Sequence, residues 1–165
     1  MGTMDLQLYK NALSSAPTSV VIVTTIDGEG QPRGFTAGSF SSLSLSPPLI
    51  MVSLHRNAEC FASFETADRF AVSVLGPQHE EVARLLATRG ADKFGGGHFR
   101  RGRDGLLYAV EAVACFSCTM QHRYPGGDHS ILVGQVEAVG LGETDKAMVH
   151  FRRGFYAVGQ DTSGF

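Results

Sequence analysis

Short runs of β-branched residues, each followed by a glycine-containing turn, recur along the chain and limit what it can fold into. Residues 19–26 are dense in Val, Ile and Thr, which favour extended backbone. Asp27-Gly28 and Gly30 follow, and these residue types tolerate the positive φ angles of tight turns. The chain has 20 glycines in 165 residues, well above the usual share of about 7%. The pattern predicts a hairpin that turns between Ile26 and Arg33, and many further turns.

Periodicity predicts the remaining elements. The cleanest alternation runs from Val110 to Met120, where every second residue is small or apolar. A loop over residues 123–128 follows, and a strand over residues 129–139 returns as a second large hairpin. Other strands are expected at residues 49–54, 70–75 and 155–156. Helices are expected at residues 5–13, after an Asn57 cap with Phe61 and Phe64 on one side, and at residues 76–86.

These elements predict the fold class. Six or seven strands joined mostly by hairpins do not give the regular strand–helix alternation of a parallel sheet. The chain is therefore expected to be mainly β with short helices, folded as an antiparallel barrel. Since 43% of the residues are hydrophobic and 18% are charged, enough apolar surface is present for a globular core. Compact domains cluster at about 100–150 residues, so residues 1–165 are expected to form one domain.

Charge and composition exclude several classes of function. The net charge of −2 provides no overall field for binding nucleic acid or an anionic membrane surface. The longest apolar runs are far shorter than the roughly 20 residues that cross a bilayer, so no membrane insertion is expected. The N-terminus lacks the basic and apolar segments of a secretory signal, and three cysteines are an odd number. A cytoplasmic location is therefore expected.

Three short motifs predict structure rather than chemistry. Residues 28–34 resemble a dinucleotide-binding fingerprint, but a hairpin and not a helix follows them, so they are interpreted as a turn. Cys115 and Cys118 form a C-x-x-C, yet residues three apart on a strand lie on opposite faces, too far apart for one zinc ion. His122 and His129 are expected near each other on a hairpin, but with His98 and Asp128 they match no metal spacing. No metal is expected.

The segment at residues 34–49 is rich in Ser and Thr and lies between strands that are expected to be buried. If these hydroxyl and backbone N–H groups face inward, they need hydrogen-bond partners. A ligand with phosphate or carbonyl oxygens would supply them. A serine-rich surface loop is the alternative that composition alone leaves open.

The run TAGSFSSLSLSPPL at residues 36–49 resembles the signature of the flavin reductase family. These proteins are FMN-binding split barrels that serve as reductase components of two-component monooxygenases. The resemblance continues in order along most of the chain. It includes residues 20–25, Asn57 with Phe61, residues 70–75, Lys93-Phe94, Gly127-Asp128-His129 with Gly134, and residues 154–156.

The resemblance implies an antiparallel split β-barrel with FMN or FAD at its site, NADH or NADPH as hydride donor, a homodimer, and a separate oxygenase as partner. It places His129 beside the nicotinamide as the catalytic residue. The implied flavin-binding residues are Thr36, Ala37, Gly38 and Ser39 along the isoalloxazine ring, Ser41 and Asn57 toward the ribityl and phosphate, and Lys93 and Phe94 near the phosphate. Gly38 departs from the family pattern, which often has Asn there.

The function expected from these residues is hydride transfer from a nicotinamide to FMN or FAD, followed by release of reduced flavin to an oxygenase. Such chemistry needs little acid–base help, because the cofactors carry it. Lys93, with Arg56 as a second cation, would offset the charge of a flavin phosphate. Two alternatives remain: a flavin-binding electron-transfer or sensing module without nicotinamide turnover, and a split-barrel oxidase acting on a small substrate such as pyridoxine phosphate.

Overall fold

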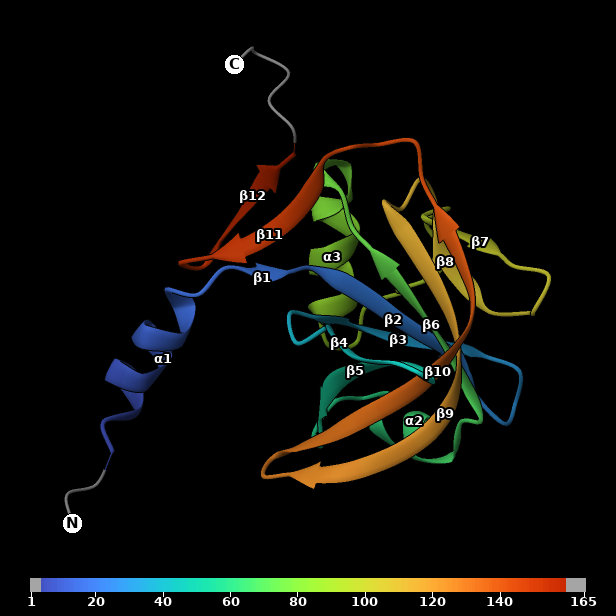
Figure 1. The fold of residues 1–165 in the computed structure, drawn as a ribbon, viewed down its shortest axis with the longest axis horizontal. Coiled ribbons are helices and arrows are strands. Elements are labelled where there is room, and N and C mark those ends of the chain that lie inside the picture. Colours follow the sequence, from blue (N-terminus) through green and yellow to red (C-terminus); the bar gives the residue numbers. More distant parts are fainter. Residues whose placement is uncertain (1–3, 160–165) are drawn as a thin grey trace.

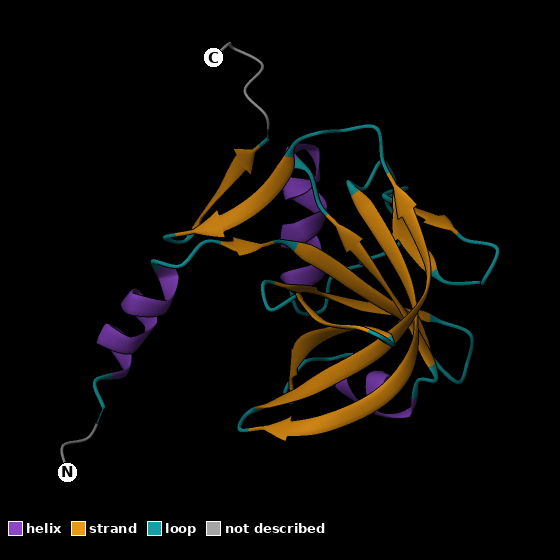
Figure 2. Cartoon of the chain, in the orientation of Figure 1, coloured by secondary structure: helices purple, strands orange, loops and turns teal. Residues whose placement is uncertain are grey.

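A curved, seven-stranded antiparallel sheet forms the body of the molecule in the computed structural model, which describes residues 4–159 (Figures 1 and 2). Its strands are β2 (Val21–Ile26), β3 (Pro32–Ala37), β4 (Ser41–Leu45), β5 (Pro48–His55), β6 (Arg69–Val74), β9 (Ala114–Gly126) and β10 (His129–Leu141). They are ordered β3-β2-β6-β9-β10-β5-β4, and every neighbouring pair is antiparallel. The predicted mainly β, antiparallel fold class is confirmed.

Two smaller sheets and short helices complete the fold. One small sheet contains β1 (Thr18–Ser19), β11 (Ala147–Phe151) and β12 (Gly154–Val158), and the other contains β7 (Phe99–Arg101) and β8 (Leu107–Ala109). The helices are α1 (Leu6–Ser14), α2 (Phe61–Thr66) and α3 (Glu80–Ala87), with the 3₁₀ turn η1 (Pro77–His79) leading into α3. The predicted helix at residues 5–13 is present as α1, capped by the Asp5 carboxylate, and it projects away from the body (Figure 1).

Alternating side chains of the large sheet pack into two separate cores. In β2, Ile22 joins the core that contains α3 and Met148, whereas Val21 and Val23 join the core that contains Phe64 of α2. Cys115 and Cys118 follow the same alternation, one in each core, and both thiols are free. The expectation that the C-x-x-C thiols lie on opposite faces of a strand is confirmed.

The structure corrects the start of the long alternating segment. Residues 110–113 form a turn, and β9 begins only at Ala114. Glu111 has a φ of 60°, which is incompatible with a strand. The apolar alternation from Val110 to Met120 is therefore a coincidence of spacing over its first four residues.

The structure also corrects two turn assignments. Residues 123–126 continue β9, and the hairpin turns at Gly127-Asp128, where Gly127 has a φ of 68°. This tight turn needs a positive φ, which Gly127 supplies without strain. Asn57 does not cap a helix, because it lies in the turn after β5 and α2 begins at Phe61 behind Cys60.

The turn between β7 and β8 is attached to the large sheet by Asp104. Its carboxylate accepts hydrogen bonds from the Tyr108 hydroxyl and from Ser117 Oγ, and Arg69 lies 3.7 Å away. Burial acts to raise the pKa of Asp104, but these hydrogen bonds outweigh it and hold the pKa below its usual value. The ionised carboxylate therefore contributes to stability.

We expect Asp104→Asn to lower the free energy of unfolding at pH 7 by about 1–2 kcal/mol, since it removes a charged acceptor from two hydrogen bonds. Because the folded-state pKa is depressed, the contribution is present above the unfolded-state pKa and is lost as the pH falls through the folded-state value. Urea unfolding of the unsubstituted protein and of Asp104→Asn, at pH 7 and at about pH 3, measures this contribution to the free energy of unfolding. A difference in the free energy of unfolding between the two proteins that stays the same at the acidic pH would contradict the prediction.

Candidate functional site

A cleft of about 630 Å³ lies between β3, the end of β5 and the C-terminal end of α3. This volume is within the range of about 300–1,000 Å³ that small-molecule and cofactor sites occupy. Its lining residues are Thr18, Gly34, Phe35, Thr36, Ala37, Gly38, Ser39, Ser53, Leu54, His55, Asn57, Ala58, Glu59, Cys60, Leu86, Ala87, Arg89, Lys93 and His129.

Most of the predicted site residues meet in this one cleft, although they are far apart in sequence. Seven line it: Thr36, Ala37, Gly38, Ser39, Asn57, Lys93 and His129. The register of the sheet explains this, since β10 pairs with β5 so that His129 lies opposite His55. The structure thereby places the start of β10 beside the turn that carries Asn57.

Two predicted residues lie elsewhere. Ser41 is exposed on the edge strand β4, and its hydroxyl donates to the Ser42 carbonyl at 3.1 Å. Phe94 lines a smaller neighbouring cavity, and its ring packs 5.0 Å from the ring of Phe99. Both residues lie outside this cleft, because the chain leaves the cleft wall at β4 and the Phe94 ring packs toward a core. Their roles toward the flavin stay predictions.

Hydroxyl groups of the Ser- and Thr-rich segment have partners within the protein. Thr36 Oγ1 donates to the Ala83 carbonyl of α3 at 2.6 Å, and Ser39 Oγ accepts from Ser53 N–H at 2.8 Å. These bonds join β3 to α3 and residue 39 to β5. A ligand is therefore not needed to satisfy the two hydroxyls, and their visible role is to hold the cleft walls in place.

Gly38 allows β1 to approach the cleft closely. A Cβ atom at this position would lie 2.8 Å from Thr18 Oγ1, closer than side-chain contacts normally come. The asparagine expected there from the family pattern would require the Thr18 side chain to move. The glycine therefore fits the local packing of β1, which lines the cleft through Thr18.

His129 belongs to a group of three polar side chains at the hairpin turn. Its Nδ1 lies 2.7 Å from Asp128 Oδ1, and His55 Nε2 lies 3.6 Å from Asp128 Oδ2. The two imidazole rings are 4.9 Å apart and nearly perpendicular. The hydrogen bond with His129 holds the pKa of Asp128 below its usual range. Since Asp128 accepts from Nδ1, His129 Nε2 is the nitrogen left for a ligand.

His122 does not join this group. It pairs with Val133, four residues along β10 from His129, and its ring stacks on Tyr124 at 5.4 Å. At about 3.3 Å per residue, the two histidines lie about 13 Å apart along the strand. The expectation that the hairpin brings them together is wrong. Among residues 4–159, no group of three His, Cys, Asp or Glu side chains is arranged to hold a metal ion.

The second charged group in the cleft is centred on Glu59. Its carboxylate accepts from Lys93 Nζ at 3.2 Å and from Gly90 N–H at 2.8 Å, and Arg89 Nε lies at 3.7 Å. Arg89, rather than Arg56, therefore lines the cleft with Lys93, and the Arg56 guanidinium lies over the Phe61 ring. The two cations and one carboxylate leave this part of the cleft with a positive balance.

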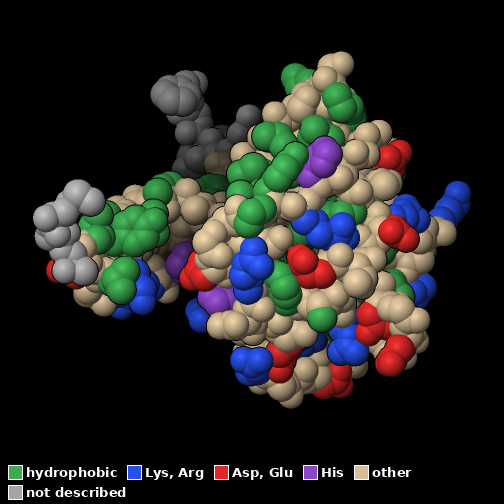
Figure 3. Space-filling view, turned by 90° about the horizontal axis from the view of Figure 1, so that it is seen from below, with side chains coloured by type: hydrophobic (Ala, Val, Ile, Leu, Met, Phe, Trp, Pro, Cys, Tyr) green, Lys and Arg blue, Asp and Glu red, His purple; other side chains and the backbone are tan. Residues whose placement is uncertain are grey.

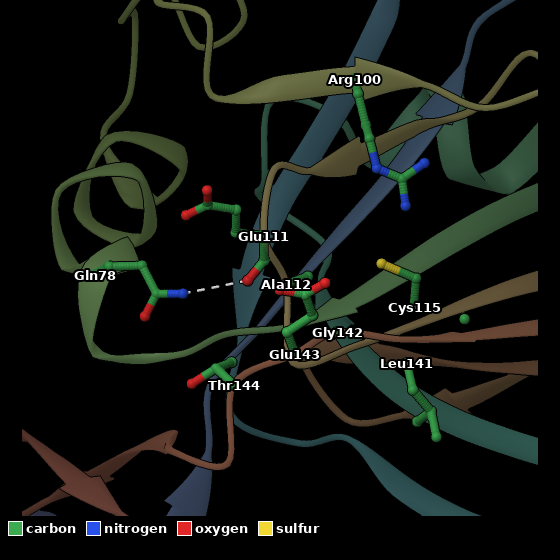
Figure 4. Close-up of a pocket in the computed structure, with 10 residues that line it drawn as sticks. Gln78, Arg100, Glu111, Ala112, Cys115, Leu141, Gly142, Glu143 and Thr144 are labelled. Carbon is green, nitrogen blue, oxygen red and sulfur yellow. Dashed lines mark hydrogen bonds between the residues drawn. The ribbon is translucent and has the colours of Figure 1, made fainter.

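A second cavity of about 490 Å³ lies near the start of β9 (Figure 4). Gln78, Arg100, Glu111 and Cys115 are among the residues around it, and Gln78 Nε2 donates to the Glu111 carbonyl at 3.2 Å. It contains none of the predicted site residues. The larger cleft with His129 and Lys93 is therefore the candidate site.

Comparison with known proteins matches residues 13–159 to the family described as "Flavin reductase like domain". The chain belongs to this family. The match includes the whole cleft and every strand of the large sheet, so the recognition made from the sequence is confirmed.

Several known proteins resemble this chain over nearly its full length. It is 42% identical over 154 residues to "Actinorhodin polyketide dimerase" of Streptomyces coelicolor, covering 93% of this chain and 87% of the relative. It is 37% identical to the "4-hydroxyphenylacetate 3-monooxygenase, reductase component" of Thermus thermophilus, covering 90% and 94%. The solved structure of Streptomyces globisporus "NADH:FAD oxidoreductase SgcE6 in complex with NAD and FAD fragments" gives a TM-score of 0.88 at 30% identity, covering 99% and 100%.

Among the cleft residues of this flavin reductase-like chain that the sequence-based predictions lack, three carry a charged or imidazole side chain: His55, Glu59 and Arg89. His55 packs against His129, Glu59 binds Lys93, and Arg89 binds Glu59, each through contact between distant segments. Glu59 and Lys93 are two charged residues 34 positions apart, and no periodicity in the sequence indicates that they meet. The sequence signal for His55 is its position directly after the predicted strand at residues 49–54.

Proposed function

We propose that this chain is an NAD(P)H:flavin oxidoreductase, which transfers a hydride from NADH or NADPH to FMN or FAD and releases reduced flavin to a separate oxygenase. The observation that carries the proposal is that one cleft combines His129, the β3 backbone and a cationic group around Lys93. Family membership and the NADH:FAD oxidoreductase with a similar fold support it.

The donor set of the cleft is suited to a flavin phosphate. Lys93, Arg89 and the Gly90 N–H converge on one oxyanion, the Glu59 carboxylate. A phosphate carries nearly two negative charges and accepts hydrogen bonds from the same kinds of donor. The carboxylate therefore marks a position where an anionic group is stable in this protein.

The protein supplies orientation and the cofactors supply the redox chemistry. A bound flavin provides the ring that accepts the hydride, and the nicotinamide provides the hydride itself. Residues 36–39 form one wall of the cleft, held by the bonds to α3 and β5. His129 offers Nε2 to the nicotinamide as a hydrogen-bonding group, and Asp128 fixes the orientation of the imidazole. Holding both rings in contact lowers the entropic part of the barrier.

Purified protein tests the proposal directly. We expect it to accelerate NADH or NADPH oxidation in the presence of added FMN or FAD, measured at 340 nm against flavin without protein. No acceleration with any of the four pairs would refute it. Protein that stays yellow through dialysis, yet is not bleached by nicotinamide without oxygen, would instead support the electron-transfer or sensing module.

The proposal includes a homodimer and a cytoplasmic location. Helix α1 has no buried residue, and Leu6, Tyr9 and Leu13 are exposed along it, as the apolar surface of the projecting helix in Figure 3 shows. A second copy would cover this apolar surface. The three free thiols agree with a reducing compartment. No helix in the described part of the chain is long and apolar enough to cross a membrane. Sedimentation of the purified protein tests the homodimer, and the mass of a single chain would contradict it.

A further inference from the structure

The Glu59 carboxylate binds three donor groups that together would suit a phosphate. Gly90 N–H and Arg89 reach Oε1, and Lys93 Nζ reaches Oε2. The Lys93 side chain is only 16% exposed, so its ammonium group is held in a defined position inside the cleft. The third donor is a backbone group, the Gly90 N–H, which lies 2.8 Å from Glu59 Oε1.

Glu59 is ionised in this arrangement. The hydrogen bond from Lys93 holds the pKa of Glu59 below its usual value, and the Gly90 N–H acts in the same direction. The carboxylate is therefore a full negative charge inside the cleft at neutral pH. A phosphate beside it would bring nearly two more negative charges to a place with two cations. Two anions that share the same donors repel each other, so the Glu59 carboxylate and a phosphate are not stable at these donors together.

We propose that Glu59 is an internal competitor for the flavin phosphate, bound to Lys93, Arg89 and Gly90 until the phosphate displaces it. This inference rests on the proposed function, because it assigns the specificity of the same cleft. The carboxylate is covalently attached and always at high local concentration, so displacing it reduces the net gain from binding a phosphate. Glu59 therefore weakens the preference for FMN over riboflavin, which differ only in the phosphate.

A consequence concerns the exchange of flavin. A flavin whose phosphate must displace a tethered carboxylate dissociates more readily, because the carboxylate returns to the donors as the phosphate leaves. The arrangement therefore favours a flavin that enters oxidised and leaves reduced, as a reductase serving a separate oxygenase requires. A tightly held prosthetic flavin would be favoured by a neutral residue at position 59.

The test is Glu59→Gln, which keeps the size and the oxygen acceptor but removes the charge. We expect the dissociation constant for FMN, measured by quenching of flavin fluorescence, to fall about three- to tenfold, as expected for losing one like charge at a partly exposed site. The constant for riboflavin should stay within about twofold. Glu80→Gln is the matched control, because Glu80 forms an ion pair with Arg84 outside the cleft and should change neither constant.

The outcomes separate this inference from the proposed function. Unchanged FMN binding in Glu59→Gln, with normal binding by the unsubstituted protein, would overturn the competitor role. Weaker FMN binding would also overturn it and would indicate instead that Glu59 positions Lys93. Equal tightening for FMN and riboflavin would also overturn it. Unsubstituted protein that binds no flavin at all would refute the proposed function itself. Thermal unfolding of each variant confirms that it is folded, and Glu59→Ala provides a second uncharged variant.

Discussion

Replacing Gly134 with alanine should lower the free energy of unfolding by about 2–3 kcal/mol, because a side chain there would overpack a closed core. A Cβ atom at Gly134 would lie 2.7 Å from Phe70 Cε1 and 2.9 Å from Cys118 Cβ. Phe70 and Cys118 are both fully buried, so neither has free space into which it can move. The new methyl group therefore has to displace β10 or rotate the phenyl ring.

Gly140→Ala is the matched control for this substitution. Gly140 lies on the same strand, β10, and a Cβ atom there would meet no atom within 4 Å. Its effect should be small, and even slightly stabilising, since alanine restricts the unfolded chain more than glycine does. Urea unfolding of the two variants side by side gives the comparison. A difference between them below about 0.5 kcal/mol would show that the core around Phe70 accommodates the methyl group.

The sequence predicts the parts of this fold that depend on neighbouring residues. The β2–β3 hairpin follows from a β-branched run and an Asp-Gly turn, and β5 begins at Pro48, the second residue of the double proline. Where a local pattern has two interpretations, prediction fails. Residues 110–113 alternate like a strand but form a turn, because Glu111 adopts a left-handed backbone conformation. Local periodicity carries no information about that choice.

The candidate site is less predictable, because pairing between distant segments builds it. Resemblance to the family predicts His129 and Lys93 as site residues. Their contacts, however, come from the register of β10 on β5 and from the loop after α3. The Ser39 hydroxyl bonds to Ser53, which a composition argument cannot anticipate. Ser41 belongs to the recognised run, and the structure places it on an exposed sheet edge outside this cleft, so its predicted role toward the ribityl and phosphate stays a prediction.

Replacing His129 with alanine should reduce kcat/KM for NADH about 10- to 100-fold, the expected loss for a strong hydrogen bond that orients the nicotinamide. The dissociation constant for FMN should stay within about twofold, since the proposed phosphate donors are on other segments. Steady-state kinetics with varied NADH and a separate FMN titration measure the two effects.

His122→Ala is the control, because His122 is exposed on the same hairpin and lies outside the cleft. It should leave both quantities unchanged. Asp128→Asn tests the same role from the other side: Asp128 fixes the His129 ring through Nδ1, so its loss should raise KM for NADH without weakening FMN binding. If His129→Ala weakened FMN binding as much as it weakened the use of NADH, the histidine would belong to the flavin site, and the nicotinamide would have to be held by other residues of the cleft.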